Sequence, residues 1–322
     1  MEGLKNKTIV IGGETVSPGK NKLVSISIGR LPTGTLIDIP VHVFNAKEPG
    51  PILLVQAGLH GDEINGVEIV RRMLYEKKFA IKKGAVIAVP ILNIFGFIHY
   101  SRDVPDGKDV NRSFPGSKTG SLAGRMAYRY VSEILPQIDF GIDLHTGGAQ
   151  RSNYPQIRYT VGDELSKDLA TAFNAPFTFS SKLIKGSFRN ISHKMGKPTV
   201  VFEGGESMRF DTHSISEGIQ GVLNVLQHFS MIEKGAIGLN KKASILLTDR
   251  RWLRAPTAGM FIPEEINGAS IKKNAVLGII TDTFTLKIKT IKAPYDGFIC
   301  AINNQAVVNQ GDALFHVGKR EF

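Results

Sequence analysis

The chain has 322 residues, of which 42% are hydrophobic and 21% charged, as in a globular protein large enough to need no disulfides. Its single cysteine, Cys300, excludes an internal disulfide and a cysteine-based zinc site, and we expect it to be buried in a strand. The net charge of +11 comes from scattered basic residues without an aromatic-and-basic nucleic-acid signature. We therefore expect a solvated basic surface and no nucleic-acid partner.

The N-terminal segment lacks the basic start and the unbroken apolar stretch of a secretory signal. No apolar run approaches the roughly 20 residues that a transmembrane helix needs. Both features predict a soluble, cytoplasmic protein with no membrane partner.

The hydrophobic pattern of the first 230 residues predicts strands and helices in alternation. Period-two patterns and short apolar runs predict strands at 23–30, 36–44, 51–58, 84–92, 140–145 and 199–205. Apolar residues at helical spacing predict helices at 63–78, 121–135, 163–173 and 214–229. This order is typical of an α/β fold with helices on both faces of a largely parallel or mixed sheet.

Beyond about residue 240 the helical periodicity ends and turn signals recur at short intervals. Two similar half-motifs, around Pro256 and Pro294, form a weak internal repeat that predicts a small all-β domain. The repeat looks structural, so we expect no catalytic group there, and we place the boundary near residues 240–244. The expected domains are a catalytic domain at 1–243, which begins with a β segment at 1–45, and a small β-domain at 244–322.

A first group of possible metal ligands follows the strand at 51–58. His60 lies in the strand-to-helix turn and Glu63 in the first helical turn, so an imidazole and a carboxylate can approach one ion together. Gly58 and Gly61 permit the tight backbone path that this turn needs. In the alternative interpretation, the acidic residues of this turn only cap the helix and His60 is a loop residue.

A second group ends the strand at 140–145. His145 is followed by two glycines, which is poorly explained as core packing, and Asp143 faces the same side of the sheet. Asp143 is placed to hold a ligating imidazole by its other nitrogen. A close His-x-x-Glu pair completed by a distant histidine is the pattern of a catalytic zinc with one position left for water. We therefore predict one zinc ion per chain, held by His60, Glu63 and His145.

A third group contains the candidate proton carrier. Glu203 ends another buried strand, where an unpaired carboxylate would be costly. A carboxylate beside an activated water can take its proton and pass it to a leaving amine. Two alternatives stay open: Glu203 is a structural partner of an arginine, or Glu206 is the base. We favour Glu203.

A polar loop at 101–112 supplies candidate substrate-binding groups. Arg102 and Arg112 offer guanidinium groups and Asn111 an amide, which suit a substrate carboxylate or a carbonyl oxygen that gains negative charge. The alternative is ordinary surface charge. The remaining histidines lack metal-ligand spacing and are interpreted as structural or surface residues: His42, His99, His193, His213, His228 and His316.

Four short motifs occur in order: GLHGDE (58–63), DVNRSFPG (109–116), DLHTG (143–147) and FEGGE (202–206). Together they resemble the succinylglutamate desuccinylase/aspartoacylase family, a deacylase branch of the zinc carboxypeptidases. The resemblance covers most of residues 37–230 and implies a zinc-carboxypeptidase-like mixed sheet. The C-terminal segment resembles a biotinyl/lipoyl-like β-domain.

The resemblance also implies roles for individual residues. It gives the same three zinc ligands and the same carboxylate partner, with Glu203 as general base and acid. Asn111 and Arg112 would hold a substrate carboxylate, and Arg102 would polarise the scissile carbonyl. Arg189 resembles a further family position to which we assign no role.

These residues predict a zinc-dependent hydrolase, an amidohydrolase that cleaves an N-acyl amino acid or a similar small N-acyl amine bearing a carboxylate. No organic cofactor is needed, and a homo-oligomer is compatible with the small β-domain. One alternative is a metallocarboxypeptidase that acts on peptide C-termini. Another is a carrier protein, in which Lys287 or Lys289 would be covalently modified.

Overall fold

The computed structural model describes residues 6–233 and 243–321, in which alternating strands and helices precede a run of strands. The helices are α1 (Ile64–Tyr75), α2 (Ile94–Ile98), α3 (Leu122–Ile134), α4 (Glu164–Phe173), α5 (Phe188–Lys194) and α6 (Thr212–His228), with a short 3-10 helix, η1 (Val110–Arg112). The strands before residue 230 are β1 (Ile9–Ile11), β2 (Glu14–Val16), β3 (Lys20–Arg30), β4 (Leu36–Asn45), β5 (Glu48–Ala57), β6 (Lys83–Val89), β7 (Phe140–Gly147), β8 (Arg151–Thr160), β9 (Phe177–Ser181) and β10 (Thr199–Glu206). The later strands are β11 (Ile245–Arg254), β12 (Gly259–Pro263), β13 (Ser270–Ile271), β14 (Val276–Thr281), β15 (Ile288–Lys292), β16 (Gly297–Asn303), β17 (Val307–Val308) and β18 (Ala313–Arg320).

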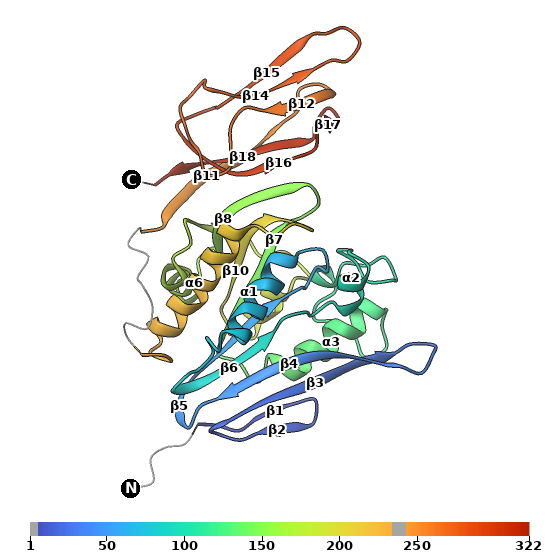
Figure 1. Cartoon of the computed structure of the whole chain (residues 1–322), viewed down its shortest axis with the longest axis vertical. Helices are drawn as coiled ribbons and strands as arrows, with labels where there is room; N and C mark the ends of the chain where they lie inside the picture. The colour runs from blue at the N-terminus through green and yellow to red at the C-terminus, as the bar shows by residue number, and fades with distance from the viewer. Residues whose placement is uncertain (1–5, 234–242, 322) are drawn as a thin grey trace.

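One mixed sheet of twelve strands extends through the described residues in the order β13-β16-β18-β11-β9-β8-β10-β7-β5-β6-β4-β3 (Figure 1). The four central strands, β6, β5, β7 and β10, are mutually parallel. Strands β1 and β2 form a separate hairpin, and β15, β14, β12 and β17 form a second sheet. The predicted α/β class is therefore confirmed, and each predicted strand and helix is present with shifts of a few residues at its ends.

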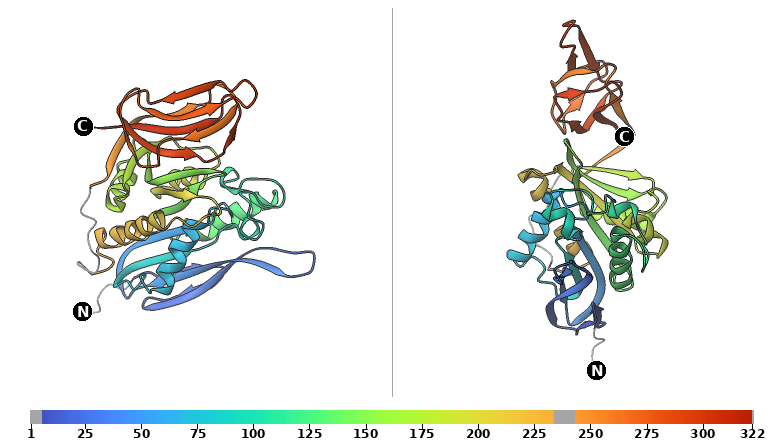
Figure 2. Two further views of the ribbon diagram at one scale, coloured as in Figure 1. Left: turned by 45° about the horizontal axis from the view of Figure 1, so that its top comes forward. Right: turned by 90° about the vertical axis from the view of Figure 1, so that its right-hand side faces the viewer.

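Helices cover both faces of the large sheet, as predicted. Helices α1, α4 and α6 share one apolar core with the sheet, in which Met73 and Phe173 are fully buried. Helix α3 covers the opposite face with Met126 and Tyr130, which lie four residues apart and so share one helix side. The right-hand view of Figure 2 separates the two layers, with the cyan α1 on one side and the green α3 on the other.

The first 230 residues also contain elements that the sequence did not predict, among them β8, β9, α2, α5 and η1. Strand β8 reads RSNYPQIRYT, in which a proline and several polar residues hide the alternation expected of a strand. Strand β9 follows it in a parallel pairing. These two strands matter because they connect the central sheet to the C-terminal strands.

The C-terminal strands build an all-β unit that is hydrogen-bonded to the rest of the molecule. Strand β11 pairs in parallel with β9, and β16 pairs with β8, so the large sheet continues into this unit. The expected boundary at 240–244 lies largely outside the described residues, and the division into two domains stays a proposal. The biotinyl/lipoyl-like character of the unit also stays a prediction, as does the carrier alternative. Lys287 precedes β15 and Lys289 lies within it, and both are exposed.

Cys300 is buried in β16, as predicted, and its burial raises the pKa of the thiol to about 12. Among the described residues, none of the helices has the length and apolar character to span a bilayer. The cytoplasmic location stays a prediction.

Tyr295 connects two strands of the C-terminal unit, β11 and β18, by hydrogen bonds. Its ring is 7% exposed, and its hydroxyl lies 2.5 Å from the carbonyl oxygen of Asp249 and 3.1 Å from that of Val317. Tyr295→Phe should lower the free energy of unfolding by about 0.5–1.5 kcal/mol, the usual net value of one hydrogen bond. Urea denaturation measures this loss, and Tyr75→Phe, at a side chain that is 80% exposed, is the matched control. Equal stability of the two variants would contradict this role of Tyr295.

Candidate metal centre and substrate cavity

The predicted site residues meet at one edge of the central sheet. Strands β5, β7 and β10 are parallel neighbours, so the turns that follow them converge at their carboxyl ends. The turn after β5 carries His60 and Glu63, β7 carries His145, and β10 carries Glu203. In the register of β7 with β10, His145 is the direct partner of Glu203.

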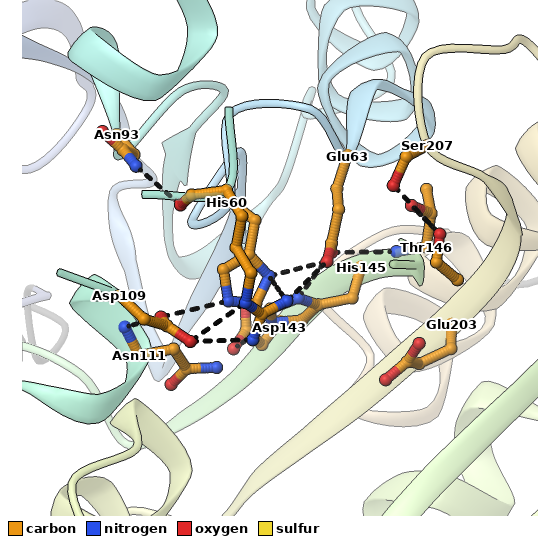
Figure 3. A network of polar contacts seen from close by, with 12 residues as sticks. His60, Glu63, Asn93, Asp109, Asn111, Asp143, His145, Thr146, Glu203 and Ser207 are labelled. Atoms are coloured by element: carbon orange, nitrogen blue, oxygen red, sulfur yellow. Dashed lines mark hydrogen bonds and ion pairs between the residues drawn. The ribbon is translucent and has the colours of Figure 1, made fainter. Parts of the chain in front are cut away.

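Glu63 lies between the two histidines (Figure 3). Its Oε1 is 2.7 Å from Nδ1 of His60, and its Oε2 is 2.7 Å from Nδ1 of His145. All three side chains are at most 5% exposed, and their potential ligand atoms lie within 4.8 Å of one another. Two imidazoles and one carboxylate in this arrangement can hold a divalent metal ion. The side chain of Glu63 makes no capping bond to α1, which argues against the capping interpretation.

Two further carboxylates hold the outer nitrogens of the histidines. Asp143 Oδ2 lies 3.0 Å from Nε2 of His145, as the same-side placement predicted. Asp109 Oδ1 lies 3.4 Å from Nε2 of His60. Carboxylates in this position fix the orientation of a ligating imidazole and increase its basicity. Asp109 was missed at the sequence level, although it begins the DVNRSFPG motif, because nothing in its spacing marks its contact with His60.

Burial and charge shape the electrostatics of the cluster. Burial alone would lower the pKa of His145 and raise that of Glu63. The carboxylates of Asp143 and Glu63 reverse the effect on His145, whose pKa is raised well above its usual value. The two histidines likewise hold the pKa of Glu63 well below its usual range. The cluster therefore stabilises a carboxylate opposite two cationic groups, and a metal ion would replace the protons of the imidazoles.

Glycine shapes the turn that carries two of these residues. Gly58 has a φ of +61°, which disfavours other residues. A Cβ atom on Gly61 would lie only 1.8 Å from the carbonyl carbon of Gly96. Both positions therefore require glycine for the close backbone path that the sequence predicted.

The cluster opens into a cavity of about 520 Å³. Three of the predicted site residues, Arg102, Asn111 and Arg112, line it. Arg102 is held by Asp109 through two hydrogen bonds, of 2.8 and 3.0 Å, and one of its nitrogens lies 3.5 Å from Glu63. Asn111 accepts a hydrogen bond from the amide of Phe188. The amide nitrogen of Asn111 and the partly exposed Arg112 therefore remain as donors along the cavity wall.

Glu203 also lines the cavity, but it has two partners. Its Oε1 lies 2.9 Å from Arg158, and its Oε2 accepts a 2.7 Å hydrogen bond from Asn153. Glu203 is thus paired with an arginine, as in the structural alternative, and it also faces the cavity. Glu206 lies outside the cavity lining and accepts a hydrogen bond from Asn304, which disfavours it as the base.

Several further cavity residues come from elements that the sequence did not reveal. Arg158 lies on β8, and Arg189 lies on α5, where it donates to Ser181 and to the carbonyl oxygen of Lys182. Burial and the charge of Arg158 lower the pKa of Arg189 to about 10. A sequence signal existed only for Arg189, from the family resemblance.

The C-terminal unit contributes to the cavity as well. Arg250, Trp252 and His316, from β11 and β18, line the same cavity as the metal cluster. His316, which we interpreted as a structural or surface residue, therefore lies at the cavity. The unit is more than a structural addition, because the pairing of β11 with β9 brings its side chains to the site.

Comparison with known proteins identifies a family for the chain. The profile of the succinylglutamate desuccinylase/aspartoacylase catalytic domain matches residues 49–229, more than half of the chain. The chain belongs to this family. All four motifs that carried the resemblance lie within the matched range.

Individual relatives cover nearly the whole chain. N-alpha-acetyl-L-2,4-diaminobutyric acid deacetylase from Halomonas elongata is 26% identical over 295 residues, which are 86% of this chain and 84% of that protein. A succinylglutamate desuccinylase/aspartoacylase structure from Rhodobacter sphaeroides has a TM-score of 0.81 at 25% identity and covers 94% of this chain and 96% of its own. The product-bound ectoine utilization protein EutE from Ruegeria pomeroyi has a TM-score of 0.80 at 23% identity, covers 93% and 95%, and shares the fold.

If His60, Glu63 and His145 are the ligands, each chain of this desuccinylase/aspartoacylase family member should bind one divalent metal ion. His145→Ala removes one of the three buried ligands and should lose most of the metal. Elemental analysis of metal-replete protein measures the content. His228→Ala, at a surface histidine paired with Asp168, is the matched control and should keep the ion. Full metal content in the His145 variant would refute the assignment.

Proposed function

We propose that the protein is a zinc-dependent hydrolase that cleaves the amide bond of a small N-acyl amino acid. The main observation that supports this proposal is the buried cluster of His60, Glu63 and His145, which opens into a cavity lined by arginines and by Glu203. Membership in the deacylase family supports the reaction class. Water is consumed, and the products are a carboxylate and an amine.

The cluster fits zinc by its chemistry. Zinc is bound in catalytic sites by three nitrogen or oxygen ligands, and the His₂Glu set is among the common ones. Each imidazole has a carboxylate at its outer nitrogen, which is the usual surrounding of a zinc ligand. When bound, zinc would supply a Lewis acid that polarises the scissile carbonyl and acidifies the attacking water.

Arg102, Asn111 and Arg112 orient the substrate in this proposal. Arg112 and the free amide nitrogen of Asn111 receive the carboxylate of the amino acid, for which a guanidinium fork is suited. Arg102 lies beside the cluster and donates to the carbonyl oxygen as this atom gains negative charge. Asp109 fixes the position of Arg102 and so prepares this donor in advance.

Glu203 moves the proton. It is the direct strand neighbour of His145, and its side chain faces the cavity. It accepts a proton from the attacking water at a carboxylate oxygen and returns it to the nitrogen of the leaving amine. Arg158 and Asn153 hold the carboxylate in place meanwhile.

The cavity favours a small substrate over a peptide. Its volume of about 520 Å³ lies within the range of small-molecule sites. Residues of β11 and β18 line it, so the C-terminal unit limits its extent. A panel of N-acetyl and N-succinyl amino acids, including N-acetyl-2,4-diaminobutyrate, compared with C-terminal dipeptides would test the proposal. Release of amine from dipeptides alone would instead support a carboxypeptidase.

Glu203→Gln tests the proton transfer. The amide keeps the shape of the side chain but cannot accept a proton, so kcat should fall by about 10²–10⁴-fold while zinc content is unchanged. Steady-state kinetics beside elemental analysis measures both. Glu206→Gln is the matched control outside the cavity lining and should keep its activity. A near-normal kcat in the Glu203 variant would exclude Glu203 as the base.

Arg112→Ala tests substrate binding. The variant loses the fork for the substrate carboxylate, an interaction made in both the ground state and the transition state. KM should therefore rise by about 10-fold or more with a small change in kcat. A loss confined to kcat would contradict this role and would place Arg112 at the reacting atoms.

A further inference from the structure

A buried amide lies beside the carboxylate that holds one of the proposed metal ligands. Strands β5 and β7 pair in parallel, with Gln56 as the direct partner of Asp143. Direct partners on adjacent strands lie side by side on the same face of a sheet. On this face Asp143 contacts the outer nitrogen of His145, and helix α3 covers the same face with Tyr130.

Gln56 is an unusual residue for its position. It is the one polar residue among residues 52–57 of β5, and the other five are apolar and buried. Gln56 itself is 0% exposed. An amide at this depth is unfavourable unless its polar atoms are hydrogen-bonded. An apolar side chain of the same size would fill the position without that requirement, so packing alone does not explain the amide.

Tyr130 fixes the orientation of this amide. Its hydroxyl donates a 2.8 Å hydrogen bond to Oε1 of Gln56. Tyr130 is fully buried, and its ring packs at an angle of 62° against Phe188, with the centroids 5.7 Å apart. Because this bond engages the oxygen of the amide, the nitrogen Nε2 is the end left for another partner. Burial and the charge of Asp143 raise the pKa of Tyr130 well above its usual value, so the carboxylate acts on this pair electrostatically.

One donor and one acceptor in this region lack partners. Among the described residues, neither Nε2 of Gln56 nor Oδ1 of Asp143 has a hydrogen-bond partner, although both atoms are buried. The other oxygen of Asp143 lies 3.0 Å from His145. The charge of Asp143 also acts on Arg189, but that guanidinium donates to Ser181 and to a backbone carbonyl. Gln56 is therefore the donor whose position on the adjacent strand matches Asp143.

We infer that Gln56 is a positioning residue of the metal centre, which donates from Nε2 to Asp143 while Tyr130 holds its amide in orientation. The inference rests on the proposed metal ligands and adds two residues that touch neither the ion nor the substrate. A carboxylate engaged at both oxygens has fewer orientations than one that contacts an imidazole alone. Asp143 in turn restricts the ring of His145, and a ligand that is already held in its binding orientation favours metal binding.

Zinc affinity tests this role. Competition with a chromophoric chelator measures the dissociation constant of zinc for each variant. Gln56→Met keeps the length of the side chain but removes the amide, so Kd should rise by about 10-fold, the lower end of the range for residues that support metal ligands. Tyr130→Phe keeps Gln56 but frees its orientation, and its Kd should lie between those of the wild type and Gln56→Met. An unchanged Kd in Gln56→Met would overturn the inference.

A double variant separates positioning from stability. Gln56→Met combined with Tyr130→Phe removes both partners of the buried hydrogen bond, so its free energy of unfolding should be closer to the wild type than that of Gln56→Met alone. Its zinc affinity should stay weak, because the donor to Asp143 is still missing. Recovery of zinc affinity together with stability would show a structural role only and would overturn the inference.

Tyr295→Phe is the matched control for Tyr130→Phe. It removes another buried tyrosine hydroxyl that donates hydrogen bonds, but Tyr295 lies outside the cavity lining. This variant should lose stability and keep the zinc affinity of the wild type. An equal loss of zinc affinity in the two variants would contradict a specific role for Tyr130.

Nuclear magnetic resonance of the metal-free chain separates this inference from the proposed function. Selective ¹⁵N-glutamine labelling reports on side-chain amides, and the signal of Gln56 is the one absent from Gln56→Met. This signal should move in Asp143→Ala, which removes the acceptor of Nε2. Asp139→Ala, the same change at an exposed carboxylate just before β7, should leave it in place. If the wild type binds no zinc, the proposed function fails, but an unmoved signal in Asp143→Ala would refute the contact independently of metal binding.

Discussion

The site depends on one buried carboxylate. Glu63 is 3% exposed, and a carboxylate at such a position is tolerated only opposite positive charge. Its two oxygens each face one imidazole, which fixes the start of α1 relative to the end of β7. The parallel pairing of β5 with β7 places Glu63 close to His145. The glycine turn after β5 allows the chain to turn so that His60 and Glu63 face each other. The arrangement of these three side chains therefore depends directly on the pairing of the central strands.

The sequence predicted the parts of the fold and site that carry local signals. Uninterrupted apolar runs identify the central strands because these strands are buried on both faces. His60, Glu63 and His145 were recognisable because each follows such a run, where polar ligating groups have no role in packing. The contact of Asp143 with His145 follows from the two-residue period of a strand. These inferences need only neighbouring residues and the parallel order of strands.

The remaining parts could not be predicted because they depend on pairings between distant segments. Strand β8 is rich in polar residues and contains a proline, so no local pattern marked Asn153 or Arg158 as part of a strand. Arg250 and Arg251 are indistinguishable in the sequence. Adjacent residues of a strand face opposite sides, and the placing of β11 beside β9 and β18 puts Arg250 on the cavity side. His316 lacked ligand spacing because it is not near the metal ligands in sequence. Its place at the cavity results from the large sheet, which continues from the central strands into the C-terminal unit.

The residues that line the cavity therefore come from segments that lie far apart along the chain. The candidate metal ligands lie between residues 60 and 145, whereas His316 lies on β18, which begins more than 160 residues after His145. Contacts between distant segments form more slowly during folding, because a longer loop must close first. On the ribosome, these candidate ligands are synthesised well before His316. The residues that line the cavity therefore come together only after the C-terminal strands have paired with β8 and β9.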